Sequence, residues 1–295
     1  MKVKKTKVKT KREKETRSLR FLYRTAVGRL FLKMLVSRGL SKATGRFMDS
    51  SLSRPLIRRF VRKNNIRLSD YEKERYRSFN ECFTRKIKPE LRPIPMEKSA
   101  LIAPCDALLS VYPIHEGSVF HIKGSDYSVK GLLGGNEELA SRYAGGTCLV
   151  FRLCVHHYHR YIYLDSGTKG ENVFINGKLH TVRPIAFESF PVFIQNCREY
   201  TVMETENFGT VTQIEVGALL VGKIHNHHGV HTFVRGEEKG MFLYGGSTVV
   251  LLLEKGAATL SEHHLSHTQN GEELEVKMGE IIGSVPERLP ESLKN

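Results

Sequence analysis

The sequence has no tryptophan, no long apolar run and few cysteines. Without a run of about 18 apolar residues, no transmembrane helix is expected. The lysine-rich start, Met1 to Lys14, lacks a well-placed apolar core and does not resemble a cleaved signal peptide. The five cysteines are odd in number, and no two have C-x-x-C spacing, which argues against a disulfide framework or a zinc–thiolate site. These absences favour a protein of a reducing cytosol.

Acidic residues are also scarce, but only in the N-terminal part. Residues 1–66 hold 21 Lys and Arg against 3 Asp and Glu, a net charge of +18. The rest holds 25 against 28, a net charge of −3, so the overall excess of +15 is entirely N-terminal. Such asymmetry indicates an acidic partner surface, either nucleic acid or an anionic membrane.

The basic region also carries apolar side chains at helical spacing. We expect residues 1–17 to be a disordered basic tail and residues 18–66 to form an amphipathic helical segment, with a second helix at Arg54–Lys63. Because nucleic-acid binding does not need a large aliphatic face, we interpret this segment as membrane-docking. A plain helical subdomain packed on the core is the alternative. The stripe includes Leu19, Leu22, Tyr23, Val27, Leu30, Phe31, Met34 and Leu35.

From residue 67 to 295 the pattern becomes that of a β protein. A helix is expected to end in the proline-punctuated stretch 68–96, and further helical signal is confined to Val129–Leu133 and Glu137–Tyr143. We predict an α+β protein, whose catalytic domain is a predominantly β, barrel-like sandwich. The segments Val234–Gly240 and Val276–Gly283 have similar sequences, which predicts two related hairpins. Short apolar runs predict strands at 108–114, 119–122, 148–155, 161–164, 211–216, 219–224 and 249–253.

A Gly-Gly-Ser-Thr element lies between two of the apolar runs. Gly245 and Gly246 leave Ser247 at a sterically open point of the backbone. The Ser247 hydroxyl can there reach the carbonyl of Gly246, which suits attack of the serine on its own preceding peptide bond. A plain Gly-Gly hairpin with a polar edge explains the same residues.

Histidines and one aspartate complete the candidate chemistry. In an extended stretch His157 and His159 share a face while His156 points away, and a neutral histidine is the usual base for activating a serine. Asp106, at the mouth of a strand, either caps a turn or orients a base histidine. His-x-His spacing and His225-Asn226-His227-His228 could bind a metal, but no carboxylate or cysteine has recognisable ligand spacing. We therefore expect no metal site.

Six motifs in order resemble those of the phosphatidylserine decarboxylase family, over about residues 45–255. Their ordered co-occurrence is far more specific than any one of them. They are Phe79-Asn80-Glu81-Cys82-Phe83-Thr84-Arg85 followed by Arg92-Pro93-Ile94; Pro104-Cys105-Asp106; Ile122-Lys123-Gly124 with Tyr127 and Leu132-Leu133-Gly134; Tyr158-His159-Arg160; Val216-Gly217-Ala218 with Val221-Gly222; and Gly246-Ser247-Thr248.

The resemblance implies an enzyme that matures by cleaving itself between Gly246 and Ser247. Its cofactor would be a pyruvoyl group made from Ser247, with no metal or separate organic cofactor. The pyruvoyl group would form a Schiff base with phosphatidylserine and release phosphatidylethanolamine. The family also implies a relay of Asp106, a histidine and Ser247, and a homodimer. From the basic amphipathic segment we expect a peripheral position on the cytoplasmic face of a membrane.

Two departures from the family pattern bear on the histidine. Many members have a second histidine after Tyr-His-Arg that is often given the relay role, but Ile162 occupies that position here. The family's aspartate before the motif is replaced by His157. We therefore assign the base to His159, with His157 as the second candidate. The alternative functions are a non-enzymatic, membrane-docked protein like a lipoyl carrier, a pyruvoyl decarboxylase of a soluble amino acid, and a nucleic-acid-binding protein.

Overall fold

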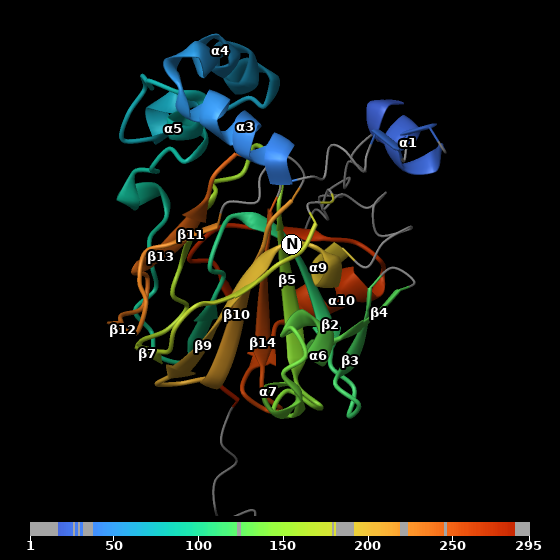
Figure 1. Cartoon of the computed structure of the whole chain (residues 1–295). Coiled ribbons are helices and arrows are strands. Elements are labelled where there is room, and N and C mark those ends of the chain that lie inside the picture. Colours follow the sequence, from blue (N-terminus) through green and yellow to red (C-terminus); the bar gives the residue numbers. More distant parts are fainter. Residues whose placement is uncertain are drawn as a thin grey trace, which may run out of the picture.

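In a computed structural model of the chain, a helical N-terminal part lies at one end of a body built from β-sheets (Figure 1). The structure describes residues 17–25, 27–28, 30–31, 38–122, 125–178, 180, 192–218, 224–244 and 247–286. Within these ranges no helix combines the length and apolar character needed to cross a membrane. Residues 1–16 of the predicted tail 1–17 lie outside them, as do Met34 and Leu35, whereas Arg17 is the first residue of a helix.

Short helices make up the N-terminal part. The predicted helix at Arg54–Lys63 is confirmed, and Pro55 occupies its first turn, where the missing N–H costs nothing. Phe60 on this helix packs edge-on against Phe79, with ring centroids 5.0 Å apart. The helical elements are α1 (Arg17–Arg24), α3 (Arg38–Asp49), η1 (Ser51–Ser53), α4 (Arg54–Lys63), η2 (Leu68–Asp70), α5 (Phe79–Phe83) and η3 (Pro89–Leu91).

A nine-stranded antiparallel sheet forms the centre of the body. Its strand order is β12-β7-β9-β10-β14-β5-β2-β16, with β8 paired to β9 beside this path. β14 is fully buried between β10 and β5, and its apolar side chains alternate between the two faces. The strands are β2 (Ala107–Pro113), β5 (Thr147–Leu153), β7 (Gly167–Lys169), β8 (Val173–Ile175), β9 (Arg198–Thr205), β10 (Gly209–Val216), β12 (His231–Phe233), β14 (Ser247–Leu253) and β16 (Leu274–Val276).

Smaller sheets and the remaining helices cover the large sheet. The strand orders are β1-β17-β15, β11-β13-β6 and β3-β4. The strands are β1 (Ala100–Ile102), β3 (Val119–Ile122), β4 (Ser125–Ser128), β6 (Arg160–Ile162), β11 (Ile224–Asn226), β13 (Glu238–Phe242), β15 (Thr259–Leu260) and β17 (Ile281–Ser284). The helices are α6 (Val129–Leu132), α7 (Glu137–Ser141), α9 (Val192–Gln195) and α10 (Glu262–Gln269).

Two hydrophobic cores lie on opposite faces of β14. Val250 and Leu252 point into one, together with Phe120 and Tyr143. Val249, Leu251 and Leu253 point into the other, which also holds aromatic residues of β6 and β13. Because its side chains are buried on both faces and it pairs with β10 and β5, β14 is firmly held, so a residue at its end has a well-defined position.

The two similar segments, Val234–Gly240 and Val276–Gly283, form the same backbone turn. In the first turn the Glu237 N–H donates to the Val234 carbonyl, and in the second the Glu280 N–H donates to the Lys277 carbonyl. The third residue of each turn is a glycine with positive φ, Gly236 (82°) or Gly279 (85°). This is the pattern of a type II turn. A Cβ on either glycine would collide with the Pro93–Ile94 segment, which lies between the turns. The predicted hairpins are wrong, however, since the strands flanking each turn pair with different partners.

Other predictions of secondary structure fare differently. The mixed α+β class is confirmed, whereas the described strands close no sheet into a barrel, so barrel-like closure stays a prediction. Helix α10 was not predicted; its sequence is polar, with only His264 buried, so no apolar period marks it. The predicted strand at 219–224 falls mostly outside the described residues.

Candidate active site

Ser247 begins the central strand. Its Cα is paired with that of Leu153 at the end of β5, and its side chain is buried with 1% exposure. In the described parts of the chain, no hydrogen-bond partner reaches the Ser247 hydroxyl. A buried polar group without a partner costs about 1–3 kcal/mol, so such a group in a native structure calls for a functional explanation. Gly245 and Gly246 lie outside the described residues.

His159 presents an unused lone pair. Its ring is fully buried, and Nδ1 lies 2.9 Å from the carbonyl oxygen of His157. Since a carbonyl can only accept, Nδ1 carries the proton and Nε2 is left as the acceptor. Nε2 has no partner among the described residues. Burial, followed by the charge of Arg85, holds the pKa of His159 well below 6.5, so the imidazole is unprotonated at neutral pH and its Nε2 lone pair is free to accept a proton.

His157 has the opposite tautomer. Its Nδ1 accepts from the backbone N–H of Cys154 at 3.0 Å, so its proton is on Nε2. The nearest carboxylate to Nε2 is that of Glu275, at 3.8 Å. Burial, with a contribution from His156, lowers the pKa of His157 to about 3. Because the lone pair of His157 is already used, the geometry favours His159 over His157 as a base.

Helix α5 supports both the histidine and the segment leading to Ser247. Phe83 packs on the ring of His159 with centroids 4.1 Å apart. Asn80 accepts from the backbone N–H of Tyr244 at 3.0 Å. Arg85, after the helix, donates to the carbonyls of His156 (3.0 Å) and His157 (3.3 Å). The Phe-Asn-x-x-Phe-x-Arg pattern, used above only to identify a resemblance, thus places Asn80 and Arg85 at the site.

Asp106 forms no hydrogen bond with His157 or His159. Its carboxylate accepts two bonds from Arg92, at 2.8 and 2.5 Å, and one from the backbone N–H of Met278, at 2.9 Å. Met278 belongs to the second type II turn, and the equivalent N–H in the first turn, of Arg235, donates to the Ser166 hydroxyl. Asp106 therefore anchors a turn in this structure, and its predicted part in a relay stays a prediction.

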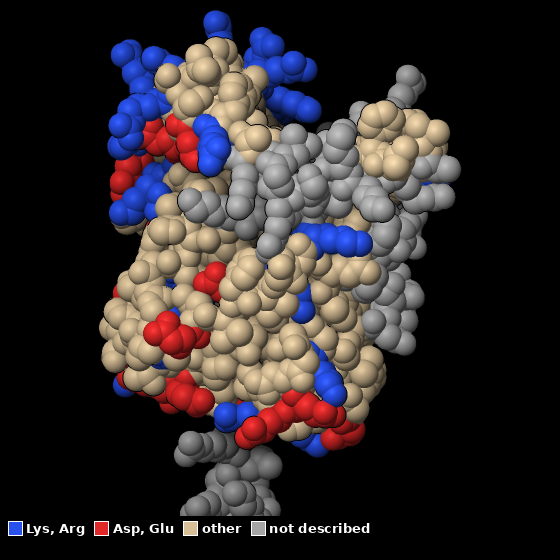
Figure 2. All heavy atoms as spheres, in the orientation of Figure 1, with Lys and Arg blue, Asp and Glu red and all other residues tan. Residues whose placement is uncertain are grey.

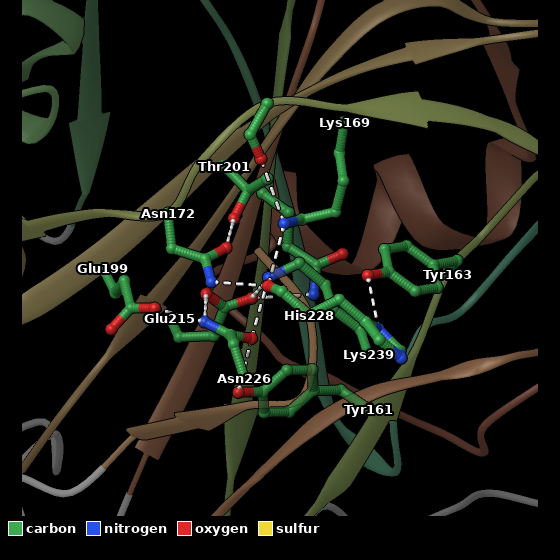
Figure 3. A network of polar contacts seen from close by, with 12 residues as sticks. Tyr161, Tyr163, Lys169, Asn172, Glu199, Thr201, Glu215, Asn226, His228 and Lys239 are labelled. Atoms are coloured by element: carbon green, nitrogen blue, oxygen red, sulfur yellow. Dashed lines mark hydrogen bonds and ion pairs between the residues drawn. The ribbon is translucent and has the colours of Figure 1, made fainter. Parts of the chain in front are cut away.

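A fully buried ion pair lies in the layer beneath Ser247. Glu215 is paired with Val249, two residues after Ser247, so Glu215 and Ser247 share a face of the sheet. Lys239 Nζ donates to Glu215 at 2.7 Å and to Asn226 at 2.9 Å, and both charged side chains are completely buried (Figure 3). Burial raises the pKa of Glu215, and Lys239 opposes the rise. No pattern in the sequence marked this pair.

The backbone relates the candidate nucleophile and base through neighbouring strand ends. Ser247, at the start of β14, is opposite Leu153, the last residue of β5, and the chain continues from Leu153 to His159. No hydrogen bond joins the Ser247 hydroxyl to His159 Nε2 in this structure. Phe83 also contacts Tyr244, with centroids 5.4 Å apart, so one aromatic side chain touches both the base and the segment before Ser247. A neutral histidine near a buried serine can accept its proton and so activate it.

Comparison with known proteins agrees with this chemistry. Residues 79–284 match the profile of a family described as phosphatidylserine decarboxylase. The chain is 46% identical over 266 residues to phosphatidylserine decarboxylase proenzyme 2 of Clostridium acetobutylicum, covering 90% of this chain and 91% of that protein. It is 40% identical over 279 residues to a phosphatidylserine decarboxylase proenzyme of Ruminiclostridium cellulolyticum, covering 91% of each. With the profile spanning both Ser247 and His159, and such identity along nearly the whole length, the chain belongs to the phosphatidylserine decarboxylase family.

Proposed function

We propose that this chain is a proenzyme that cleaves itself between Gly246 and Ser247 and then decarboxylates phosphatidylserine. The observation that carries the proposal is the buried Ser247 hydroxyl, which has no partner among the described residues, together with the unused lone pair of the buried, neutral His159. His159 accepts the hydroxyl proton while the serine oxygen attacks the Gly246 carbonyl. The C–N bond between Gly246 and Ser247 then breaks, and its nitrogen takes up the proton, which gives an ester and a free amine on Ser247. Proton loss from the Ser247 α-carbon then breaks the ester C–O bond and releases the Gly246 carboxylate.

The residue left at position 247 fits a pyruvoyl group. Loss of the ester leaves a dehydroalanine, and its hydrolysis gives a ketone with release of ammonia. When present, this group supplies an electron sink for the pair of electrons left by departing carbon dioxide. In the proposed reaction His159 holds or returns a proton at Nε2, and Phe83 packs on its ring with centroids 4.1 Å apart.

Self-cleavage is tested by replacing the nucleophile. Ser247→Ala removes the attacking oxygen, so the chain should stay whole and inactive, whereas the unaltered chain should give fragments of 246 and 49 residues. Intact-mass spectrometry should show the shorter fragment blocked at its first residue. Thr248→Val is the matched control, because Thr248 is equally buried but points to the opposite face of β14. An active preparation that remains uncleaved would sink the proposal.

The helical part supplies the membrane-docking surface of the proposed enzyme. Lys and Arg side chains gather over the end formed by α3 and α4 (Figure 2). Among them Leu52 and Leu56 are exposed, at 76% and 38%. Phe60 of α4 contacts Phe79 and Phe83 of α5, so the proposed docking surface adjoins the helix that supports His159. In the predicted N-terminal stripe, Leu30 and Phe31 are exposed while Leu22 packs on the core.

This position would let the lipid head group reach the site while its acyl chains stay in the bilayer. Each CH₂ drawn into water costs about 0.8 kcal/mol, and each Lys or Arg near an anionic surface contributes about 1 kcal/mol. The enzyme would therefore be a peripheral protein of the cytoplasmic membrane face. The dimer implied by the resemblance is a separate prediction, which analytical ultracentrifugation tests.

Vesicle sedimentation tests the docking surface. The Leu52→Gln/Leu56→Gln double variant should bind phosphatidylserine vesicles at least about tenfold more weakly, while self-cleavage stays unchanged. Met96→Gln, which alters an equally exposed apolar side chain outside α3 and α4, is the control. Binding by the unaltered protein should fall with added salt but not vanish, because the apolar contribution is not screened. Equal pelleting of the double variant and the control would exclude this surface.

A further inference from the structure

Three potential metal ligands converge away from Ser247, on the segment between β11 and β13. They are His228, His231 and Glu237, and their ligand-capable atoms all lie within 4.8 Å of one another. Nε2 of His231 is 2.8 Å and Nε2 of His228 is 3.5 Å from the same carboxylate oxygen of Glu237. All three side chains are partly exposed, between 26% and 30%. Solvent therefore reaches the cluster.

The backbone that carries His228 is fixed from the large sheet. Lys169 Nζ donates to the carbonyl oxygens of His228, at 3.0 Å, and of Gly229 (Figure 3). Asn172 Nδ2 donates to the same His228 carbonyl at 2.8 Å. Burial lowers the pKa of Lys169, and its ammonium group is used here to hold a loop. A position held by this many bonds is preorganised, which a site for a small ion requires.

The other two ligands are fixed as well. His231 opens β12 and is paired with Lys169 on β7. Glu237 closes the first type II turn, and its second carboxylate oxygen accepts from the Val234 N–H at 3.1 Å. The turn thereby leaves one oxygen of Glu237 directed at the two histidines.

His228 also has an outer partner that sets its tautomer. Its Nδ1 lies 3.2 Å from the hydroxyl of Tyr163. When Nδ1–H donates to that oxygen, the Nε2 lone pair faces Glu237, and metal-binding histidines are commonly oriented by such a bond.

We propose that His228, His231 and Glu237 bind a divalent transition metal, with Zn²⁺ the ion their chemistry fits best. Two imidazole nitrogens and one carboxylate oxygen form an established zinc donor set, with a fourth position for water. A tetrahedral site separates its donors by about 3.3 Å, close to the observed 2.8 and 3.5 Å. The two rings now stack with centroids 3.9 Å apart and planes at 13°. Since a metal lies near the plane of each ring that binds it, one ring must rotate when the ion enters.

A metal here would tie β12 to the turn that precedes β13. β13 supplies the buried Lys239 and continues into the segment before Ser247. The ion would thus brace a strand of the site without contacting substrate. The sequence alone suggested only His225-Asn226-His227-His228, because Glu237 is brought to the histidines by the type II turn and not by spacing.

The test uses the full-length protein, dialysed against a chelator and then titrated with Zn²⁺ in calorimetry. We expect one ion per chain, with a dissociation constant tighter than about 10 µM. His231→Gln and His228→Gln should each weaken binding about 100-fold or more, and Tyr163→Phe about tenfold. His227→Gln is the matched control, since His227 is adjacent but pairs with Glu238 at 2.7 Å. Thermal melts without zinc verify that each variant is folded.

Two outcomes would overturn the proposal. One is the absence of binding at this affinity in the unaltered protein. The other is binding that survives His231→Gln but is lost in His156→Gln, which would place the ion at the second candidate cluster, Cys154, His156 and His157. Self-cleavage is measured in parallel by mass, so failure of the metal site and failure of the proposed maturation are read separately.

Discussion

Two buried polar regions lie close together in this molecule and are satisfied to different degrees. Around Ser247, the serine hydroxyl and the Nε2 atoms of His157 and His159 have no hydrogen-bond partner in the described residues. In the layer below, Lys239, Glu215 and Asn226 bond to one another and to Glu199 and Tyr161. Lys239 and Glu215 are as deeply buried as Ser247 and His159. In their network only Oε1 of Gln213, whose amide donates to Glu215 at 2.9 Å, has no partner among the described residues.

This difference in hydrogen bonding distinguishes a region suited to a reaction from one that stabilises the fold. A buried polar network stabilises a fold when nearly all of its members are paired, and it costs free energy when they are not. The Lys239–Glu215 network therefore has the character of a structural element. The unpaired serine and histidines lower stability and are best explained by a reaction that uses them. Substitutions in the two regions should accordingly affect different measurements.

The largest effect is expected from the base. His159→Ala should slow self-cleavage about 10²–10⁴-fold, because the lone pair that accepts the serine proton is lost. His157→Ala should slow it much less, since the His157 lone pair is already bonded to the Cys154 N–H. The rate is measured by the disappearance of the 295-residue chain after synthesis. The reverse ranking of the two variants would show that the base is His157.

The pH dependence of cleavage sharpens the same comparison. A base acts when unprotonated, and burial holds the pKa of His159 well below 6.5. The rate constant of cleavage should therefore stay level as the pH falls from about 8 to about 6. With a histidine of ordinary pKa as the base, the rate constant would already have fallen to half at a pH of about 6.5. A midpoint near 6.5 in cleavage followed by gel densitometry would contradict the buried environment of His159.

A stability effect of intermediate size is expected in the structural region. Lys239→Met leaves the buried Glu215 carboxylate without a counter-charge, although Gln213 and Asn226 still donate to it, and should lower the free energy of unfolding by about 3–5 kcal/mol. Without Lys239, the folded-state pKa of Glu215 rises further above its unfolded value. Stability is then retained below the unfolded pKa and is lost as the pH rises, so the deficit should be larger at about pH 8 than at about pH 5.

Urea unfolding of uncleaved protein, prepared in the Ser247→Ala background, measures this effect. The control is the Lys239→Met/Glu215→Gln double variant, which removes both charges and should recover part of the loss. If the Lys239→Met protein is as stable as its parent but inactive when Ser247 is present, the Lys239–Glu215 network takes part in the reaction and is not only structural.

The sequence predicted those features that depend on local pattern. The family, the α4 helix, most strands and the position of Ser247 before a buried run follow from periodicity and ordered motifs. The choice of His159 rested on a missing family histidine, and its tautomer could not be foreseen because it depends on a backbone carbonyl. Asn80, Arg85 and Glu237 act through contacts between segments distant in sequence, which no spacing rule captures.

Asp106 is where the sequence interpretation and the geometry differ most. The resemblance gives it a place in a relay, whereas its carboxylate here holds Arg92 and the Met278 N–H. Hydrogen bonds to a charged group contribute about 1.5–3 kcal/mol, so Asp106→Asn should lower the free energy of unfolding by about 2 kcal/mol.

The smallest expected effect on cleavage follows from the same contacts. Because the tautomer of His159 is set by the carbonyl of His157 and not by Asp106, folded Asp106→Asn protein should still cleave within about tenfold of the normal rate. Arg92→Gln is the matched control, since it removes the other half of the ion pair without touching the carboxylate. If the two variants are equally destabilised in urea but only Asp106→Asn stalls as an intact chain, the carboxylate itself takes part in the proton relay. If both cleave alike, the bidentate pair with Arg92 is the whole of its role.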